Sequence, residues 1–299
     1  MKLPWFIRII CYPILAFLLL QACGSGLSHE EEVELWHQDR VERLSAERGW
    51  LKLAGLFWLE DGTHTFGTAD TNDIILPENS ILPEAGSLTI NGSMITLSPA
   101  EDGLFSINGE ALTGSLTFPV ENALEPEHGR LAFTFIERGG EIALRLYDEQ
   151  SYVYTGFTGI ERFPVNAAFK TEAKLIPHEQ ASSLPILNVL GQVTDTDSPG
   201  ILTFELGGEP LSLWALGEAD DEQLFLIVAD HTNREETFGG GRFLYVPNPG
   251  PNGTVLLDFN KLYNPPCAFS DYTTCPLPPP ENRLPVRIEA GEKRYHQYF

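Results

Sequence analysis

The feature that most constrains the fold is a series of short apolar runs between residues 87 and 147, separated by turn signals. Asn91-Gly92, Asp102-Gly103 and Asn108-Gly109 lie between successive runs, and such pairs favour the tight turns of β-hairpins. Short strands at this spacing are typical of a β-sandwich. The expected strands are Ser87–Ile90, Met94–Leu97, Leu104–Ile107, Gly114–Phe118, Leu131–Ile136 and Ile142–Tyr147.

A single helix is predicted ahead of these strands. Ser28 and Glu31 have the spacing of a capping box at its N-terminal end. We expect Gly49 to end the helix in the left-handed conformation that glycine adopts readily. The apolar run Trp50–Leu59, followed by turn residues, then predicts a buried strand.

The chain from residue 161 onward continues with apolar runs of strand length, including a hairpin expected about Gly207-Gly208. Strands and helices do not alternate, and no Gly-rich loop opens a helix, which excludes a nucleotide-binding parallel sheet. The predicted fold class is all-β: one N-terminal helix, a β-sandwich over residues 50–160, and a second β domain over residues 161–299. Further strands are expected at Gln223–Ala229, Arg242–Val246, Thr254–Phe259 and Leu284–Glu289.

The first 22 residues predict a lipoprotein signal peptide. Lys2 and Arg8 precede an apolar run, Ile9–Leu20, which is short for a membrane span. Leu20-Gln21-Ala22-Cys23 resembles the lipobox of bacterial lipoproteins, and an uncleaved membrane anchor is the alternative. The resemblance implies lipidation of Cys23, a tether and helix over residues 23–49, and a location at the periplasmic face of the bacterial cell envelope. In a Gram-negative host, the outer membrane is favoured.

The charge balance restricts the class of partner. The chain has 42 acidic and 19 basic residues and a formal net charge of −23. Binding to nucleic acid needs clustered Lys and Arg, so a nucleic-acid partner is not expected. Contact with anionic lipid is expected only through the lipid anchor.

The stretch HTFGTADTNDIILPENS (residues 64–80) resembles the core of forkhead-associated domains, which are small β-sandwiches. Gly67, the Asp-Ile-Ile-Leu run and Ser80 match that core. Thr68 stands where the family has its phosphate-binding Arg, and Ile81-Leu82-Pro83 replaces the family's Arg-x-His. The resemblance therefore implies the sandwich as a scaffold, and a phosphothreonine peptide is not an expected partner because such recognition needs the Arg.

Three longer blocks resemble one bacterial family, domain of unknown function 1684. They are ERFPVNAAFK (161–170), residues 229–246 and residues 255–295. With residues 49–67 included, the likeness covers nearly all of the chain after Cys23. The resemblance implies a soluble, mostly β body, and no activity is assigned to the family.

Two cysteines, Cys267 and Cys275, lie among the prolines of the segment 263–285. In an oxidising envelope such a pair favours a disulfide, and closing so short a loop would stabilise the protein by roughly 2.5 kcal/mol. The alternative is a transition-metal site, in which Asp230 and His231 complete the ligands. No other cofactor is predicted.

Polar residues follow two predicted strands, in DHTNREE (230–236) and DFN (258–260). Functional sites often lie at strand ends, but Asp, Thr and Asn also close turns by bonding their own backbone, so both roles stay open. If the site is catalytic, carboxylates would act as acid and base, and an Arg would hold an anionic substrate. The catalytic candidates are Asp230, Glu236, Asp258 and Arg242. The ligand-binding candidates are Asn233, Arg242, Asp258, Asn260, Tyr263, Asn264, Arg162, Asn166 and Lys170.

The common hydrolase signatures are absent from the sequence. The sequence therefore favours a non-catalytic role, in which residues 229–295 bind a small molecule or an envelope protein. The alternative is a metal-dependent hydrolase that uses the four catalytic candidates, so the sequence leaves open whether the protein is an enzyme.

Overall fold

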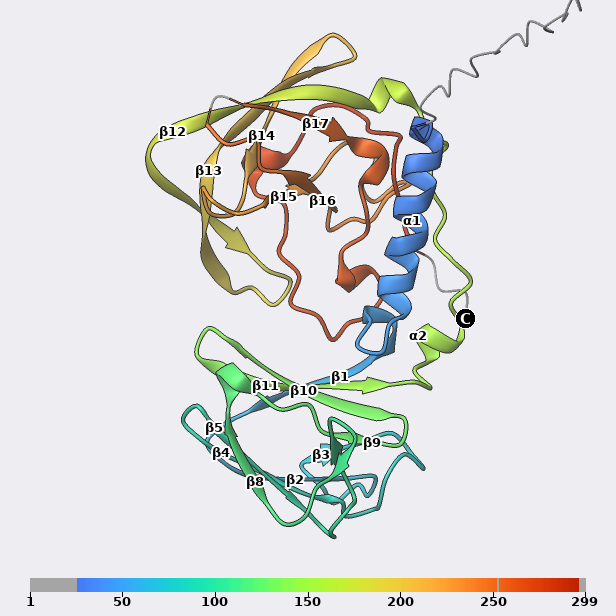
Figure 1. The fold of residues 1–299 in the computed structure, drawn as a ribbon, viewed down its shortest axis with the longest axis vertical. Helices are drawn as coiled ribbons and strands as arrows, with labels where there is room; N and C mark the ends of the chain where they lie inside the picture. Colours follow the sequence, from blue (N-terminus) through green and yellow to red (C-terminus); the bar gives the residue numbers. More distant parts are fainter. Residues whose placement is uncertain (1–25, 252, 296–299) are drawn as a thin grey trace, which may run out of the picture.

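The structure is a computed structural model that describes residues 26–251 and 253–295. These residues are mostly β, as the sequence predicted, and they form several sheets with one long helix near the N-terminal end (Figure 1). The predicted signal peptide and Cys23 lie outside the described residues. Within the described ranges, no helix has the length and apolar character needed to cross a membrane.

Helix α1 (His29–Ser45) begins at the predicted capping box. The Ser28 hydroxyl accepts from the backbone N–H of Glu31, and the Glu31 carboxylate accepts from the backbone N–H of Ser28 at 2.8 Å. The prediction for Gly49 was wrong, because the helix ends at Ser45 and Gly49 has an ordinary φ of −71°. Glycine is needed there for close packing, since a Cβ would lie 2.1 Å from the Leu44 carbonyl oxygen.

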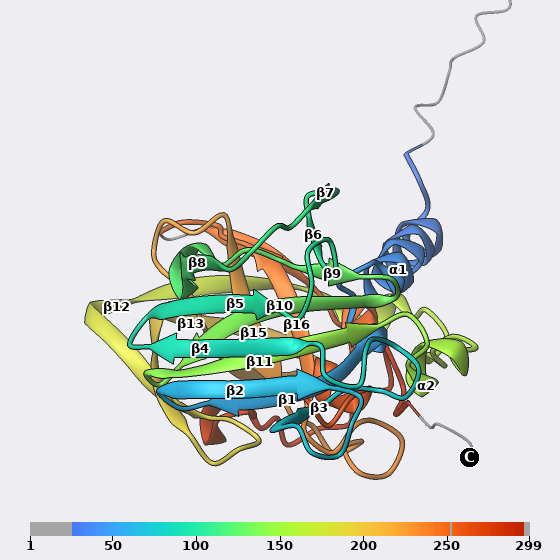
Figure 2. The same cartoon turned by 90° about the horizontal axis from the view of Figure 1, so that it is seen from below.

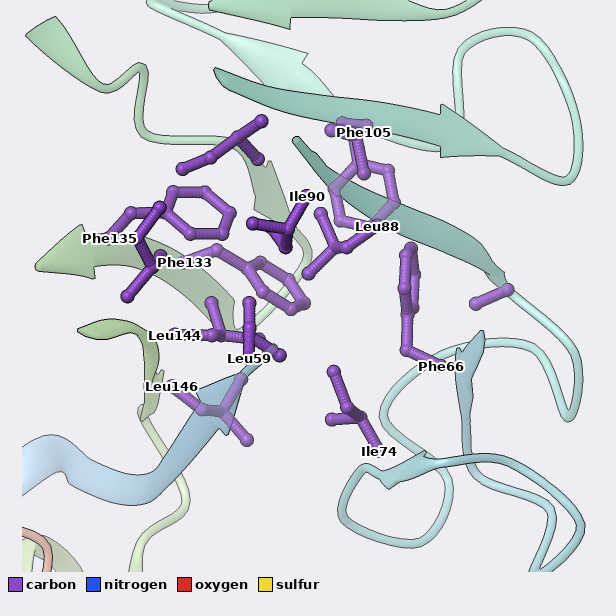
Figure 3. Packing of buried hydrophobic residues seen from close by; sticks show 14 of the residues in the cluster. Leu59, Phe66, Ile74, Leu88, Ile90, Phe105, Phe133, Phe135, Leu144 and Leu146 are labelled. Atoms are coloured by element: carbon purple, nitrogen blue, oxygen red, sulfur yellow. The ribbon is translucent and has the colours of Figure 1, made fainter. Parts of the chain in front are cut away.

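The N-terminal part is the predicted β-sandwich, and two sheets enclose its core. One sheet has the order β1-β11-β10-β9-β6-β7, and the other has the order β3-β2-β4-β5-β8. Phe66, Phe105 and Phe133 meet in the core with ring centroids 5.3–6.1 Å apart (Figure 3). The strands are β1 (Leu53–Leu59), β2 (Gly62–Gly67), β3 (Ile74–Ile75), β4 (Gly86–Asn91), β5 (Met94–Pro99), β6 (Ser106–Ile107), β7 (Glu110–Ala111), β8 (Leu116–Pro119), β9 (Glu127–His128), β10 (Leu131–Arg138) and β11 (Glu141–Asp148).

Short helical turns lie before, within and after these strands. The run Trp50–Leu59 was predicted as one strand, but Trp50–Lys52 is a 3₁₀ turn (η1) that precedes β1. Further short turns are η2 (Val120–Asn122), α2 (Tyr152–Thr155) and η3 (Ala167–Phe169).

The C-terminal part contains a four-stranded sheet of order β14-β13-β12-β17 and the pair β15-β16. The predicted turn at Gly207-Gly208 does join β13 to β14. The two long strands β12 and β13 pair with a register break between Pro177 and Ser182, where β12 bends. The strands are β12 (Lys170–Leu187), β13 (Val193–Leu206), β14 (Glu209–Ala215), β15 (Gln223–Val228), β16 (Arg242–Pro247) and β17 (Thr254–Asp258), and the 3₁₀ turns are η4 (Phe259–Lys261), η5 (Pro266–Ala268) and η6 (Pro280–Asn282).

The strand predicted at Leu284–Glu289 was wrong, because this segment is an irregular loop. Its backbone groups bond to other loops instead of a neighbouring strand. Leu284 donates to the carbonyl of Ala229, and Ile288 donates to the Asp230 carboxylate at 3.2 Å. A residue such as Ile288 is buried by these contacts, so its apolar character did not signal a strand.

Helix α1 lies along the C-terminal part, while the sandwich lies below both (Figure 1) and in front of the C-terminal part when the molecule is turned (Figure 2). His29 bonds the Asp258 carboxylate at 2.8 Å, and Arg40 donates to the carbonyl of Asn264 at 2.9 Å. The helix is therefore fixed to β17 and to the segment after it.

The imidazole of His37 is buried on α1, and this position predicts a dependence of stability on pH. Burial, together with the charge of nearby Arg162, lowers the pKa of His37 to about 4, and its Nδ1 atom has no hydrogen-bond partner among the described residues. A neutral buried His stabilises the fold above its unfolded pKa, and this contribution is lost as the pH falls through the folded pKa. We expect a loss on the order of 1–3 kcal/mol between pH 6.5 and pH 4.

Thermal melts of the wild type and of His37→Gln at pH 7, 5.5 and 4.5 measure this contribution. The wild type should lose more stability over the series than the variant, because only the wild type takes up this proton on unfolding. Parallel curves for the two proteins would show that His37 does not titrate in this range.

Candidate functional site

Asp230 and Arg242, two of the catalytic candidates, form a fully buried ion pair. Their side chains are both 0% exposed, and Nη2 of Arg242 lies 2.8 Å from Oδ2 of Asp230. Arg242 also donates to the carbonyls of Ile288 and Ala290, and the Asp230 carboxylate accepts from the backbone N–H of Thr232 at 2.8 Å. Solvent does not reach either group, so the geometry supports a structural role in which the pair fixes the loop at 288–290 to β16.

Asp258 and Asn260 also serve the fold. Asp258 caps η4, because its carboxylate accepts from the backbone N–H and from the side-chain amide of Asn260. The Asn260 amide in turn exchanges hydrogen bonds with the backbone of Asn166, at 2.9 and 3.0 Å. The structure therefore brings these three predicted site residues together, as a clamp between the end of β17 and the chain before β12.

The other candidates are separated, and most of them have a partner within the fold. Glu236 pairs with Arg287 on the surface, and Asn233 bonds within the turn 230–238. The side chains of Arg162 and Lys170 pair with acids of α1, and buried Asn264 donates to the carbonyl of Lys293. The turn chemistry that the sequence left open as an alternative is the role that this geometry supports.

Cys267 and Cys275 are free thiols in the structure, so the predicted disulfide is not present in it. Sγ of Cys275 accepts from the backbone N–H of Cys267 at 3.1 Å and donates to the Thr273 hydroxyl at 3.6 Å. A side-chain hydrogen bond between the two thiols lowers the pKa of Cys275, while the same side-chain bond and burial raise the pKa of Cys267. Hydrogen bonds, not a covalent bond, join the two ends of this loop.

The predicted metal alternative required Cys267, Cys275, Asp230 and His231 to meet. Across residues 26–251 and 253–295, no group of three or more His, Cys, Asp or Glu side chains is arranged to hold a metal ion. Asp230 is bound to Arg242 instead. This set of metal ligands therefore has no support in the geometry.

A cavity of about 510 Å³, which the sequence did not reveal, lies where the sandwich, α1 and the C-terminal part meet. We call it the arginine cavity. Tyr263 and Cys275, two of the residues that the sequence singled out, are among those that line it. The full lining is Arg40, Trp50, Arg138, Arg145, Phe225, Phe243, Tyr245, Tyr263, Pro266, Thr273, Thr274, Cys275 and Pro276.

The charge of this lining is opposite to that of the protein as a whole. Three arginines line the arginine cavity and no acidic side chain does, although the chain has a net charge of −23. Arg40 already has partners, because it donates to the Asn264 carbonyl and its Nε lies 3.6 Å from Oε1 of Glu292. The positive charge available to a ligand therefore comes from Arg138 and Arg145.

Arg145 is the more buried of these two arginines. It is half-buried, no carboxylate lies within 4.0 Å of it in the described part of the chain, and its Nε is buried without a hydrogen-bond partner. Its guanidinium lies 5.1 Å from the ring of Trp50. Burial lowers the pKa of Arg145, the hydrogen-bonded Tyr147 side chain partly offsets this effect, and the charge of Arg138 lowers the pKa further.

The alternation of side chains along β11 indicates from the sequence which way Arg145 points. Ile142, Leu144 and Leu146 point into the sandwich core, so Arg145 points to the outer face of the sheet. Sequence reasoning can thus place Arg145 away from the core. It cannot show that β16 and the segment 263–276 cover that face and turn it into a cavity.

The fold and the cavity define a mostly β protein with a cationic, aromatic-lined pocket. The model of the family described as protein of unknown function (DUF1684) matches residues 155–293, and the chain belongs to this family. The match includes Phe225, Phe243 and Tyr263 but not Trp50 or Arg145, so the family region supplies only one side of the arginine cavity.

Comparison with solved structures finds an uncharacterised protein of Haloarcula marismortui, known from a solution NMR structure. It is 31% identical, over 46% of this chain and 78% of that chain, with a TM-score of 0.40. No curated protein matches this chain.

Proposed function

We propose that this protein binds a small organic anion in the arginine cavity. The observation that carries the proposal is Arg145, a half-buried guanidinium with no acidic partner among the described residues. Removing a charge from water without a partner is costly, and a bound carboxylate or phosphate offsets that cost with charge-assisted hydrogen bonds.

The remaining lining supports an organic ligand over an inorganic ion. Trp50, Phe225, Phe243 and Tyr263 supply apolar surface, and the cavity volume of about 510 Å³ is in the range of sites for small molecules. Aromatic side chains gain most by burying a ring or an alkyl group of the ligand. The ligand should therefore combine an acidic group with an apolar or planar part.

The setting of this binding is also a proposal. Lipidation at Cys23 would tether the binding part to the bacterial cell envelope, where the ligand would be met at the periplasmic face. The ligand-binding role expected for residues 229–295 would then fall on Phe243, Tyr245, Tyr263 and the loop 266–276, and not on the polar candidates at the strand ends.

A calorimetric titration against matched pairs of ligands tests the proposal. Each pair is an aromatic or aliphatic carboxylate and its neutral primary amide, supplemented by the corresponding phosphate monoester. We expect saturable binding of anions, at least tenfold weaker binding of the amides, and affinity that falls with added salt because an ion pair is screened. Equal affinity for an acid and its amide would contradict the proposal, as would the absence of saturable binding across the panel.

A further inference from the structure

A second cavity, of about 450 Å³, adjoins the arginine cavity and shares Arg40, Tyr245 and Tyr263 with it. Its other walls include Trp36 and Arg43 of α1. The two cavities therefore adjoin at these three side chains, and we call the two together the groove. This groove runs from the outer face of the sandwich sheet to the exposed side of α1.

The second half of the groove repeats the chemistry of the first. Arginine and aromatic side chains line it, and no acidic side chain does. Arg43 is paired with Asp39, but both side chains are more than half exposed, and an exposed ion pair of this kind contributes little and is readily exchanged for another anion. A ligand that extends past Tyr263 therefore meets a second cation.

Tyr245 supplies the accessible aromatic surface in the middle of the groove, and Tyr263 lies packed beside it. Tyr245 is 51% exposed, although one face of its ring stacks on Phe225 at a centroid distance of 4.8 Å and an angle of 28°. The ring of Tyr263 lies between Trp36, with centroids 6.1 Å apart, and the guanidinium of Arg40, at 4.6 Å. Such amphipathic platforms accept ligands that have an apolar face and a polar rim.

An extended peptide fits this groove less well. Peptides that bind along strands need an unpaired edge for main-chain hydrogen bonds. At the groove, β16 pairs with β15 on one side, and Phe243 exchanges backbone hydrogen bonds with Tyr263 on the other. Main-chain pairing of a peptide is therefore blocked at Phe243, whereas rings and cations line both cavities.

We infer that the groove takes an elongated acidic oligosaccharide, with one carboxylate at Arg145 and further sugar units over Tyr245 and past Tyr263 towards Trp36 and Arg43. A pyranose ring has an apolar face for the aromatic side chains, and a uronic acid adds the negative charge. The inference rests on the proposed function, because it assigns the class of anion and a second subsite to the same groove.

Titration with galacturonic acid and its dimer and trimer tests this inference. We expect affinity to rise at least tenfold from monomer to trimer, and neutral trisaccharides of the same length to bind more weakly. Arg43→Gln should remove much of the gain in affinity from monomer to trimer. It should leave binding of the monomer unchanged, because Arg43 lines only the second cavity. Trp36→Ala should likewise reduce the affinity for the trimer more than the affinity for the monomer. If the half-buried Trp36 proves necessary for folding, Arg43→Gln still tests the second subsite.

Each other outcome overturns the inference in an identifiable way. If the monomer binds and the affinity does not rise with the length of the ligand, the proposed function stands and the second subsite is ruled out. A gain with length that both α1 variants retain would place the extra units elsewhere. Tighter binding of an acidic tripeptide than of the trimer would assign the groove to a peptide. Failure of every anion, including those of the matched pairs above, would overturn the proposed function as well.

Discussion

Replacing Asp230 with Ala is expected to lower the free energy of unfolding by about 3–5 kcal/mol. The substitution leaves the Arg242 guanidinium charged and fully buried, without its carboxylate partner at 2.8 Å. It also removes the acceptor for the backbone N–H groups of Thr232 and Ile288. Equilibrium denaturation in urea, followed by circular dichroism, measures the change.

Two further variants make this result specific to the buried pair. Glu235→Ala, in the same loop, removes an exposed carboxylate that pairs with Arg287, and it should change stability by less than about 1 kcal/mol. Asp230→Leu combined with Arg242→Met should recover part of the loss, because no charge is then left buried without a partner. A catalytic Asp230 predicts the opposite pattern, in which Asp230→Ala unfolds like the wild type.

Replacing Arg145 with Met is expected to weaken binding of the organic anion on the order of 100-fold. Loss of one partner from a buried, hydrogen-bonded charge pair commonly costs 2–5 kcal/mol of affinity, and about 2.7 kcal/mol corresponds to this factor. The folded protein should be as stable as the wild type or more stable. The variant removes a half-buried cation that lacks an acidic partner and retains an apolar side chain to pack on Trp50.

Arg138→Gln and Arg145→Lys are the matched controls. Arg138 is exposed, so its removal should weaken binding only several-fold, and the difference should shrink at high salt. Arg145→Lys keeps the charge but loses the planar, bidentate geometry and the stacking on Trp50, so its affinity should fall between those of the wild type and Arg145→Met. Unchanged affinity in Arg145→Met, with ligand still bound in the cavity, would show that another cation holds the anion.

The two predictions concern arginines of opposite kinds, and the difference lies in their surroundings. Arg242 is fully buried with a carboxylate and two carbonyls around it, which fixes the fold. Arg145 has a tryptophan ring, Tyr147 and a second arginine nearby and no carboxylate, which is why we propose it as the anion-binding residue. The sequence singled out Arg242 and passed over Arg145, because residue type and position on a strand do not show which partners the fold provides.

The parts of the fold that were predictable depend on neighbours along the chain. The capping box at Ser28 and the hairpin at Gly207-Gly208 need only a few consecutive residues. The alternation of β11 also follows from the chain itself, because side chains of a strand point to opposite faces in turn. Local patterns therefore identified the mostly β character and the helix.

The parts that were missed depend on contacts between distant residues. The long strand β12 contains Pro177 and Pro185 and many polar residues, and its pairing with β13 and β17 compensates for this unfavourable pattern. Leu284–Glu289 has the apolar content of a strand, but Asp230 and Ala229 bind its backbone as a loop.

The sequence by itself determined the fold class, the start of the helix, most of the strands and the overall acidity, since each follows from local pattern or composition. The tertiary structure decided which polar residues are structural and which face a cavity. The groove is lined by Arg40, Arg145 and Tyr263, and each of these lies more than 100 residues from the next along the chain. Only the packing of the sandwich against the C-terminal part places them in one groove. Burial and charge compensation arise from that packing, so they cannot be assigned to a residue before its partners are known.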